Sequence, residues 1–213
     1  MFLSATLRKL SLLLLLILTL AGFRSDKKEF SGLIVYKNSF TTLQGQDISE
    51  KLAPYLGAEH HYYISGNNYK TYNEKKQLIQ LYTGATNEYA YFKDGQLAQK
   101  MDAAQPSSTD VKVTLLPQGT TILGYPCKAL QLVADGVTTM YYYTPALKVN
   151  PEAYAQHQFG DWYTYMKATQ GAIMLKYVVT NPKVGYVMTS EATAIRPLPM
   201  TTADFTVTAA EPQ

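Results

Sequence analysis

The sequence has little cysteine and little charge. Of its 213 residues one is cysteine, 16% are charged, and the formal net charge is +3. The single cysteine, Cys127, excludes an internal disulfide. Two of the positive charges, Arg8 and Lys9, lie in a segment that we expect to be removed, so no basic field remains to recruit nucleic acid. Because 46% of the residues are hydrophobic, the composition also excludes a disordered chain.

Tryptophan is equally scarce, whereas tyrosine is abundant. One tryptophan stands against 18 tyrosines, and tyrosine favours β structure. The pairs Asp94-Gly95 and Asp135-Gly136 are hairpin turn signals, and turns of two residues join antiparallel neighbours. No stretch alternates strands with long helices, which disfavours a doubly wound sheet. The chain therefore predicts an antiparallel meander.

The expected elements follow from apolar runs between turn signals. Strands are predicted at residues 30–39, 59–65, 69–73, 77–83, 87–93, 97–101, 111–116, 127–134, 137–144, 172–180 and 184–195, with Pro117 ending the seventh run. A short helix is expected within residues 44–57, and a second one at residues 160–169, where Trp162, Tyr165, Met166 and Thr169 have helical spacing. The loop at 103–108 is not a domain boundary, because either half alone would leave open sheet edges.

Several of these runs are apolar on one side, and a sheet with one apolar face has to cover it. With one or two short helices available, a strongly curved sheet wrapped partly around them is the economical solution. We therefore predict a mainly β (α+β) protein, built as a single domain over residues 23–213.

The first 22 residues resemble a secretory signal peptide. Arg8 and Lys9 begin it, the apolar run 10–20 follows, and small residues precede a cleavage site at Ala21–Gly22. The alternative is an uncleaved anchor, but residues 10–23 are shorter than the roughly 20 apolar residues that span a bilayer. Since Phe23 stands where a lipoprotein needs cysteine, we expect an unlipidated periplasmic or secreted protein that does not span the membrane after cleavage.

No catalytic pattern is present. The sequence lacks a phosphate-binding glycine loop, a Gly-x-Ser-x-Gly elbow and a His-Glu-x-x-His motif. His60 and His61 are adjacent, so on a strand they point to opposite faces, and His157 is distant. Cys127 lies in a strand-like run and is expected to be a buried core residue. We therefore expect no catalytic residues, no metal site, no cofactor and no enzymatic activity.

Short motifs in the second half resemble a family of secreted bacterial proteins. The run Thr121-Ile122-Leu123-Gly124-Tyr125-Pro126-Cys127-Lys128-Ala129 is similar to the signature of uncharacterised Bacteroidetes proteins related to the GLPGLI-type family, although the Gly-Leu-Pro-Gly-Leu-Ile string itself is missing. The runs 142–145 and 171–177 follow in the family's order, and 32–36 resembles its first strand. The resemblance implies a half-barrel similar to the lipoprotein carriers LolA and LolB, with helices over the concave face.

Two functions remain open. The first is a periplasmic module that binds or carries a lipid or another apolar molecule in the concave face. The second is a structural or protein-interaction module of the cell envelope with a self-filled core. Individual tyrosines could also serve only in cross-strand packing. For the carrier, the expected lining consists of aromatic and methionine side chains: Tyr36, Tyr142, Trp162, Met166, Met174 and Tyr177.

Overall fold

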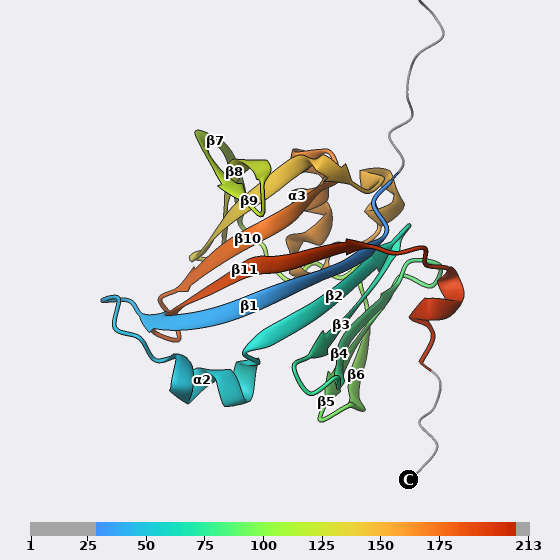
Figure 1. Cartoon of the computed structure of the whole chain (residues 1–213), viewed down its shortest axis with the longest axis horizontal. Helices are drawn as coiled ribbons and strands as arrows, with labels where there is room; N and C mark the ends of the chain where they lie inside the picture. Colours follow the sequence, from blue (N-terminus) through green and yellow to red (C-terminus); the bar gives the residue numbers. More distant parts are fainter. Residues whose placement is uncertain (1–28, 208–213) are drawn as a thin grey trace, which may run out of the picture.

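The computed structural model describes residues 29–207, and its main feature is one open sheet of eleven antiparallel strands (Figure 1). The strands are β1 (Gly32–Thr42), β2 (Glu59–Ser65), β3 (Asn68–Asn73), β4 (Leu78–Thr83), β5 (Glu88–Lys93), β6 (Gln96–Asp102), β7 (Val111–Ile122), β8 (Tyr125–Ala134), β9 (Val137–Lys148), β10 (Ala172–Asn181) and β11 (Tyr186–Pro197). The predicted fold class is confirmed: the protein is a mainly β half-barrel with short helices.

The first and last strands pair at the centre of the sheet. The strand order is β6-β5-β4-β3-β2-β1-β11-β10-β9-β8-β7. The chain therefore runs outward from β1 to one edge, crosses to the opposite edge, and returns to β11. Leu33 of β1 faces Arg196 of β11, and Phe40 faces Met188. This long central pairing joins the two halves of the chain in one sheet.

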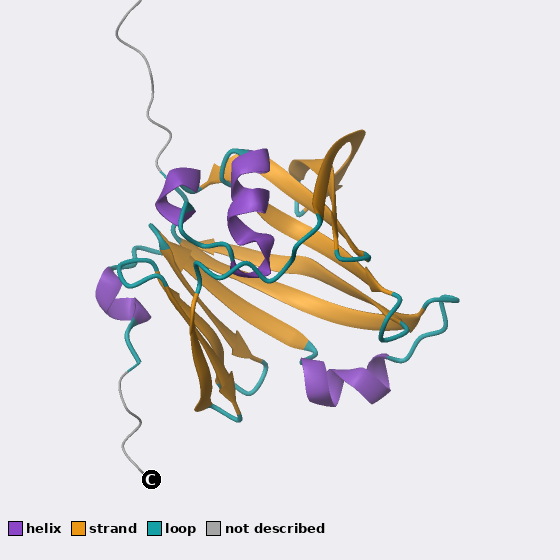
Figure 2. Ribbon diagram, turned by 180° about the vertical axis from the view of Figure 1, so that it is seen from behind, coloured by secondary structure: helices purple, strands orange, loops and turns teal. Residues whose placement is uncertain are grey.

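The crossing between the two edges is made by residues 103–110, which Figure 2 shows as a loop that runs over the concave side. Ala103 is fully buried, and its carbonyl accepts hydrogen bonds from the backbone N–H groups of Gln158 and Phe159. Ser108 donates to the carboxylate of Asp161 over 2.9 Å. The crossing loop thus anchors residues 158–161, which directly precede the helix that covers the sheet.

That helical segment lies between β9 and β10. It holds the 3-10 turns η1 (Pro151–Tyr154) and η2 (Phe159–Asp161) and the helix α3 (Trp162–Thr169), and Figure 2 shows α3 over the concave face. Tyr165, Met166 and Thr169 are the buried residues of α3 and have the spacing of one helix face. Gly171 ends the helix with a positive φ of 75°, and its N–H donates to the Met166 carbonyl.

The curvature of the sheet coincides with breaks in strand register. The pairing of β1 with β11 shifts between Val35 and Tyr36, where β11 has one extra residue, Thr193. The pairing of β9 with β10 shifts twice, where β9 has the extra residues 145–147 and where β10 has the extra residue Leu175. A bulge bends its strand and increases the local twist. These central bulges help the sheet to wrap around α3.

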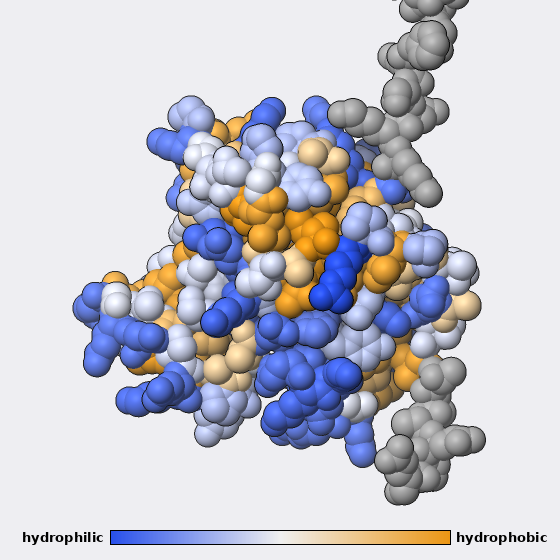
Figure 3. Space-filling model, viewed as in Figure 1, coloured by the Kyte–Doolittle hydropathy of each residue, from blue (hydrophilic) through white to orange (hydrophobic). Residues whose placement is uncertain are grey.

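Two other helical elements lie apart from this segment in the chain. The helix α2 (Ser49–Leu56) follows β1, and the turn η3 (Thr202–Phe205) follows β11. Phe205 of η3 is buried against the outer face of the sheet, beside Leu81 and Phe92. The ammonium of Lys70 lies 5.8 Å from the Phe205 ring centre. The view of Figure 3 shows hydrophilic side chains over much of the surface, with an apolar area near the middle strands.

Most predicted elements agree with the structure, but the seventh strand was predicted too short. β7 continues through Pro117 to Ile122, because β7 is an edge strand with a register shift between Leu116 and Gly119. Proline is tolerated at such positions, since no ladder hydrogen bond is lost. The predicted signal peptide lies outside the described residues. Among residues 29–207, no helix is long and apolar enough to cross a membrane.

Candidate functional site

A cavity of about 480 Å³ lies between the concave face of the sheet and α3. Sites for small molecules have volumes of about 300–1,000 Å³, so this cavity can hold one small ligand. Side chains from both halves of the chain line it: Tyr62 and Tyr69 come from β2 and β3, and Tyr177 and Met188 come from β10 and β11. The cavity therefore depends on the central pairing of β1 with β11.

The lining is mostly aromatic and aliphatic. Eight tyrosines contribute: Tyr36, Tyr62, Tyr69, Tyr89, Tyr141, Tyr165, Tyr177 and Tyr186. The apolar remainder consists of Leu56, Phe159, Gly160, Trp162, Met166, Ile173, Met174, Val179 and Met188, and three polar residues complete it: His60, Thr71 and Gln80. Lysine, arginine, aspartate and glutamate are absent from this described lining. Such a surface suits an apolar molecule with at most a small polar group.

Strand alternation decides which tyrosines face the cavity. On β2, Tyr62 lines the cavity while its neighbour Tyr63 packs beside Leu81 and Phe92 on the outer face. On β10, Met174 and Tyr177 both line the cavity although three positions separate them. The register shift between Met174 and Lys176 accounts for this, because the extra residue Leu175 turns Tyr177 to the same face of the sheet as Met174.

Hydrogen bonds hold several lining hydroxyls in place. The Tyr36 hydroxyl donates to the Met174 carbonyl over 2.6 Å, and the Tyr165 hydroxyl donates to the Ala172 carbonyl over 2.9 Å. Burial, reinforced by the Tyr177 hydroxyl, raises the pKa of Tyr36 well above its usual value. Burial likewise raises the pKa of Tyr89 to about 12. These phenols are therefore neutral near pH 7.

A stacked aromatic cluster supports the wall of the cavity beside α3. His157 is 1% exposed, and its ring centre lies 4.1 Å from that of Tyr82 and 5.7 Å from that of Tyr69. A hydrogen bond of 2.8 Å joins its Nε2 to the Tyr69 hydroxyl. Burial lowers the pKa of His157 to about 4. The imidazole is therefore a neutral part of the core, and Trp162, 6.1 Å from it, bridges this cluster to the cavity.

Five of the six residues predicted to line a ligand site do line the cavity: Tyr36, Trp162, Met166, Met174 and Tyr177. Tyr142 does not. It lies between two inward-facing neighbours on β9, Tyr141, which lines the cavity, and Tyr143, which is in the core. Tyr142 is therefore on the opposite face, where the Lys176 ammonium lies 6.0 Å from its ring centre. Alternation within the Tyr141-Tyr142-Tyr143 run does not say which face is concave, so the sequence alone does not separate Tyr142 from its two inward-facing neighbours.

Several other side chains of the lining were not predicted from the sequence. Tyr62, Tyr69, Tyr141 and Tyr165 are in the lining but were not predicted there. The spacing of Tyr165 on the predicted helix, one turn after Trp162, was the available signal for that residue. For the strand tyrosines, the pairing of β1 with β2 and of β9 with β10 decides which side chains point to the concave face, and the sequence alone does not give that pairing.

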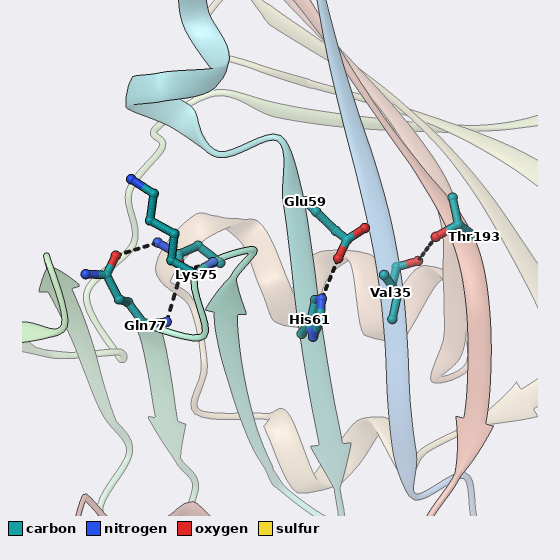
Figure 4. Close-up of polar contacts among 7 residues, drawn as sticks. Val35, Glu59, His61, Lys75, Gln77 and Thr193 are labelled. Atoms are coloured by element: carbon teal, nitrogen blue, oxygen red, sulfur yellow. Dashed lines mark hydrogen bonds and ion pairs between the residues drawn. The ribbon is translucent and has the colours of Figure 1, made fainter.

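The histidines and the cysteine occupy separate places. His60 lines the cavity, whereas His61 pairs with the carboxylate of Glu59 on the other face of β2 (Figure 4). Cys127 is buried, as predicted, and burial raises the pKa of its thiol. Within residues 29–207, no three His, Cys, Asp or Glu side chains are grouped so that they could hold a metal ion.

Comparisons with known proteins give distant structural matches. No protein-family model and no curated protein matches the sequence. Matched structures include PNGF-II, with 16% identity, a TM-score of 0.49, and coverage of 81% of this chain and 28% of that protein. A LolA superfamily protein from Nitrosomonas europaea matches with 10% identity, a TM-score of 0.37, and coverage of 84% and 91%. A DUF1329 family protein from Desulfovibrio piger matches with 10% identity, a TM-score of 0.25, and coverage of 85% and 91%.

This chain thus spans less than a third of PNGF-II. At TM-scores below 0.5, neither ligand nor activity transfers from any of these proteins. The resemblance to the GLPGLI-type family stays a prediction.

Proposed function

We propose that this protein is a non-catalytic binding or carrier protein of the periplasm or cell exterior, which holds a lipid or another apolar molecule in the concave cavity. The observation that carries the proposal is a cavity of about 480 Å³ whose described lining is aromatic and aliphatic and holds no charged side chain of lysine, arginine, aspartate or glutamate. An apolar ligand gains free energy by leaving water for such a surface, at about 25 cal/mol per Å².

The second candidate is a structural or interaction module of the cell envelope whose core is filled by its own side chains. The stacked cluster around His157 is filled in this way. The adjoining cavity is large enough for a small ligand, and this favours the carrier.

Uptake of the neutral apolar fluorophore N-phenyl-1-naphthylamine tests the proposal. Val179 of β10 lines the cavity, whereas its neighbour Val178 is not in the lining, and both are half-buried. We expect saturable fluorescence enhancement with the wild-type protein and with Val178→Trp. With Val179→Trp we expect at least about tenfold weaker binding, because the indole occupies the cavity.

Thermal unfolding of both variants establishes that each is folded. Native mass spectrometry of protein purified from its own cell envelope supplies a second readout, in which a co-purifying lipid supports the proposal. No enhancement with wild-type protein, together with no bound lipid, would favour the structural module.

A further inference from the structure

The uncharged lining restricts what kind of polar group a ligand can bring into the cavity. Besides the tyrosines, the described lining has one titratable residue, His60. Burial lowers the pKa of His60, which keeps its imidazole neutral near pH 7. An ionised group that enters this cavity finds no ion of opposite sign in the lining, and burying such a group unpaired costs far more free energy than burying a neutral one.

One carboxamide group faces this space. Gln80 of β4 lines the cavity, and its carboxamide oxygen accepts a hydrogen bond of 3.3 Å from the hydroxyl of Thr71 on β3. Thr71 is 3% exposed, so the neighbour that orients the amide is itself fixed in the core. Among residues 29–207, the Gln80 amide nitrogen has no acceptor of its own. Its two N–H groups are therefore available to a ligand.

The facing of Gln80 follows from the strand register. Gln80 pairs with Tyr91, two residues along β5 from Tyr89, and Tyr89 lines the cavity. The amide is thus on the concave face, in the half of the sheet that contains β3, β4 and β5. Across the sheet, the lining from β10 and β11 is tyrosine, methionine, isoleucine and valine. The cavity consequently has a neutral polar side and an apolar side.

We infer, on the basis of the proposed function, that the cavity selects an uncharged amphiphile, with the ligand's neutral oxygen group hydrogen-bonded by the Gln80 amide and its hydrocarbon part against β10, β11 and α3. The class comprises molecules such as monoacylglycerols, fatty esters and fatty alcohols. A free fatty acid in its ionised form is excluded by the desolvation of its carboxylate.

Competition between two matched probes tests this selectivity. Monolaurin and laurate share one acyl chain and differ in the charge of the polar group. Each is titrated, in mildly alkaline buffer below its micelle concentration, against wild-type protein loaded with N-phenyl-1-naphthylamine. We expect monolaurin to displace the fluorophore at least about tenfold more effectively than laurate, because only laurate brings an unpaired charge.

The variant Gln80→Leu identifies the recognising group. It keeps a side chain of similar size and removes the amide. Monolaurin binding is expected to weaken about five- to tenfold, the effect of one lost hydrogen bond, while laurate and the fluorophore bind as before. Gln99→Leu, on the exposed strand β6, is the matched control and leaves all three affinities unchanged.

A double variant guards against a folding artefact. Thr71→Val combined with Gln80→Leu removes both hydrogen-bond partners, so no buried hydroxyl loses its acceptor. It is expected to unfold at a temperature close to that of the wild type and to show the same loss of monolaurin affinity.

The outcomes separate this inference from the proposed function. If the fluorophore binds but monolaurin and laurate compete equally, or if Gln80→Leu leaves monolaurin binding unchanged, the selectivity for an uncharged amphiphile is refuted and the apolar carrier stands. If neither the fluorophore nor either lipid binds, the proposed function itself fails.

Discussion

Acid is expected to destabilise this protein in a pH range set by His157. The imidazole is buried, stacked on the Tyr69 ring and packed against the tilted Tyr82 ring, and burial lowers its pKa from 6.5 to about 4. The unfolded chain binds this proton as the pH falls through about 6.5, whereas the folded protein resists it until about pH 4. The contribution of the neutral His157 to the free energy of unfolding is therefore fully present above pH 6.5 and is lost as the pH falls to about 4.

The magnitude follows from the size of the shift. A difference of one pKa unit corresponds to about 1.4 kcal/mol, so the free energy of unfolding is expected to fall by about 3 kcal/mol across this range on account of His157. His60 adds to the loss in the same direction, since burial lowers its pKa too. Asp47, Asp135 and Asp204 have pKa values lowered from 3.8 by hydrogen bonds. These carboxylates titrate mostly below this range.

Urea unfolding at a series of pH values between 7 and 4 measures the effect. Wild-type protein is compared with His157→Phe, which keeps a stacked ring and cannot be protonated. The variant is less stable at pH 7, because the Tyr69 hydroxyl loses its partner. Its stability should nevertheless fall by about 3 kcal/mol less between pH 7 and pH 4 than that of the wild type. Equal pH dependence in the two proteins would refute the assignment to His157.

Two further predictions concern stability. Gly171→Ala is expected to lower the free energy of unfolding by at least about 2 kcal/mol, because φ is 75° and an added Cβ would collide with the Val149 carbonyl. Gly185→Ala, with φ of 79° and open space around it, should cost about 1 kcal/mol. Chemical denaturation compares the two variants, and equal losses would contradict the role of the Val149 contact. Phe205→Ala removes a ring that is 2% exposed and should lower the free energy of unfolding by about 3 kcal/mol. Val207→Ala, at a side chain that is 51% exposed, should change stability little. An unchanged melting temperature in Phe205→Ala would show that η3 does not stabilise the sheet.

Much of the fold could be predicted from local signals. The turns at Asp94-Gly95 and Asp135-Gly136, both with positive φ at each residue, fixed where strands end and which neighbours pair. The helix at 162–169 was visible as the spacing of Trp162 and its neighbours. Chain order alone, however, gives no signal for the pairing of β1 with β11 across more than a hundred residues.

The site was harder to predict because it depends on facing. Side chains alternate along a strand, so a one-residue difference changes the face. Tyr142 was assigned to the cavity although its neighbour Tyr141 is the residue that lines it. Met174 and Tyr177 both reach the cavity only because of a bulge that the run of apolar residues does not reveal. Gln80 was overlooked because a glutamine on a strand ordinarily faces water.

The central claim, that the concave cavity takes up an apolar molecule, is tested most directly through Trp162. It is the one tryptophan of the sequence and lines the cavity, so its fluorescence reports what lies there. Titration with a brominated monoacylglycerol, whose heavy atoms quench indole on contact, should produce saturable quenching at a one-to-one ratio, and the unbrominated lipid should produce none. Fluorescence that stays constant up to the solubility limit of the brominated lipid would contradict the account.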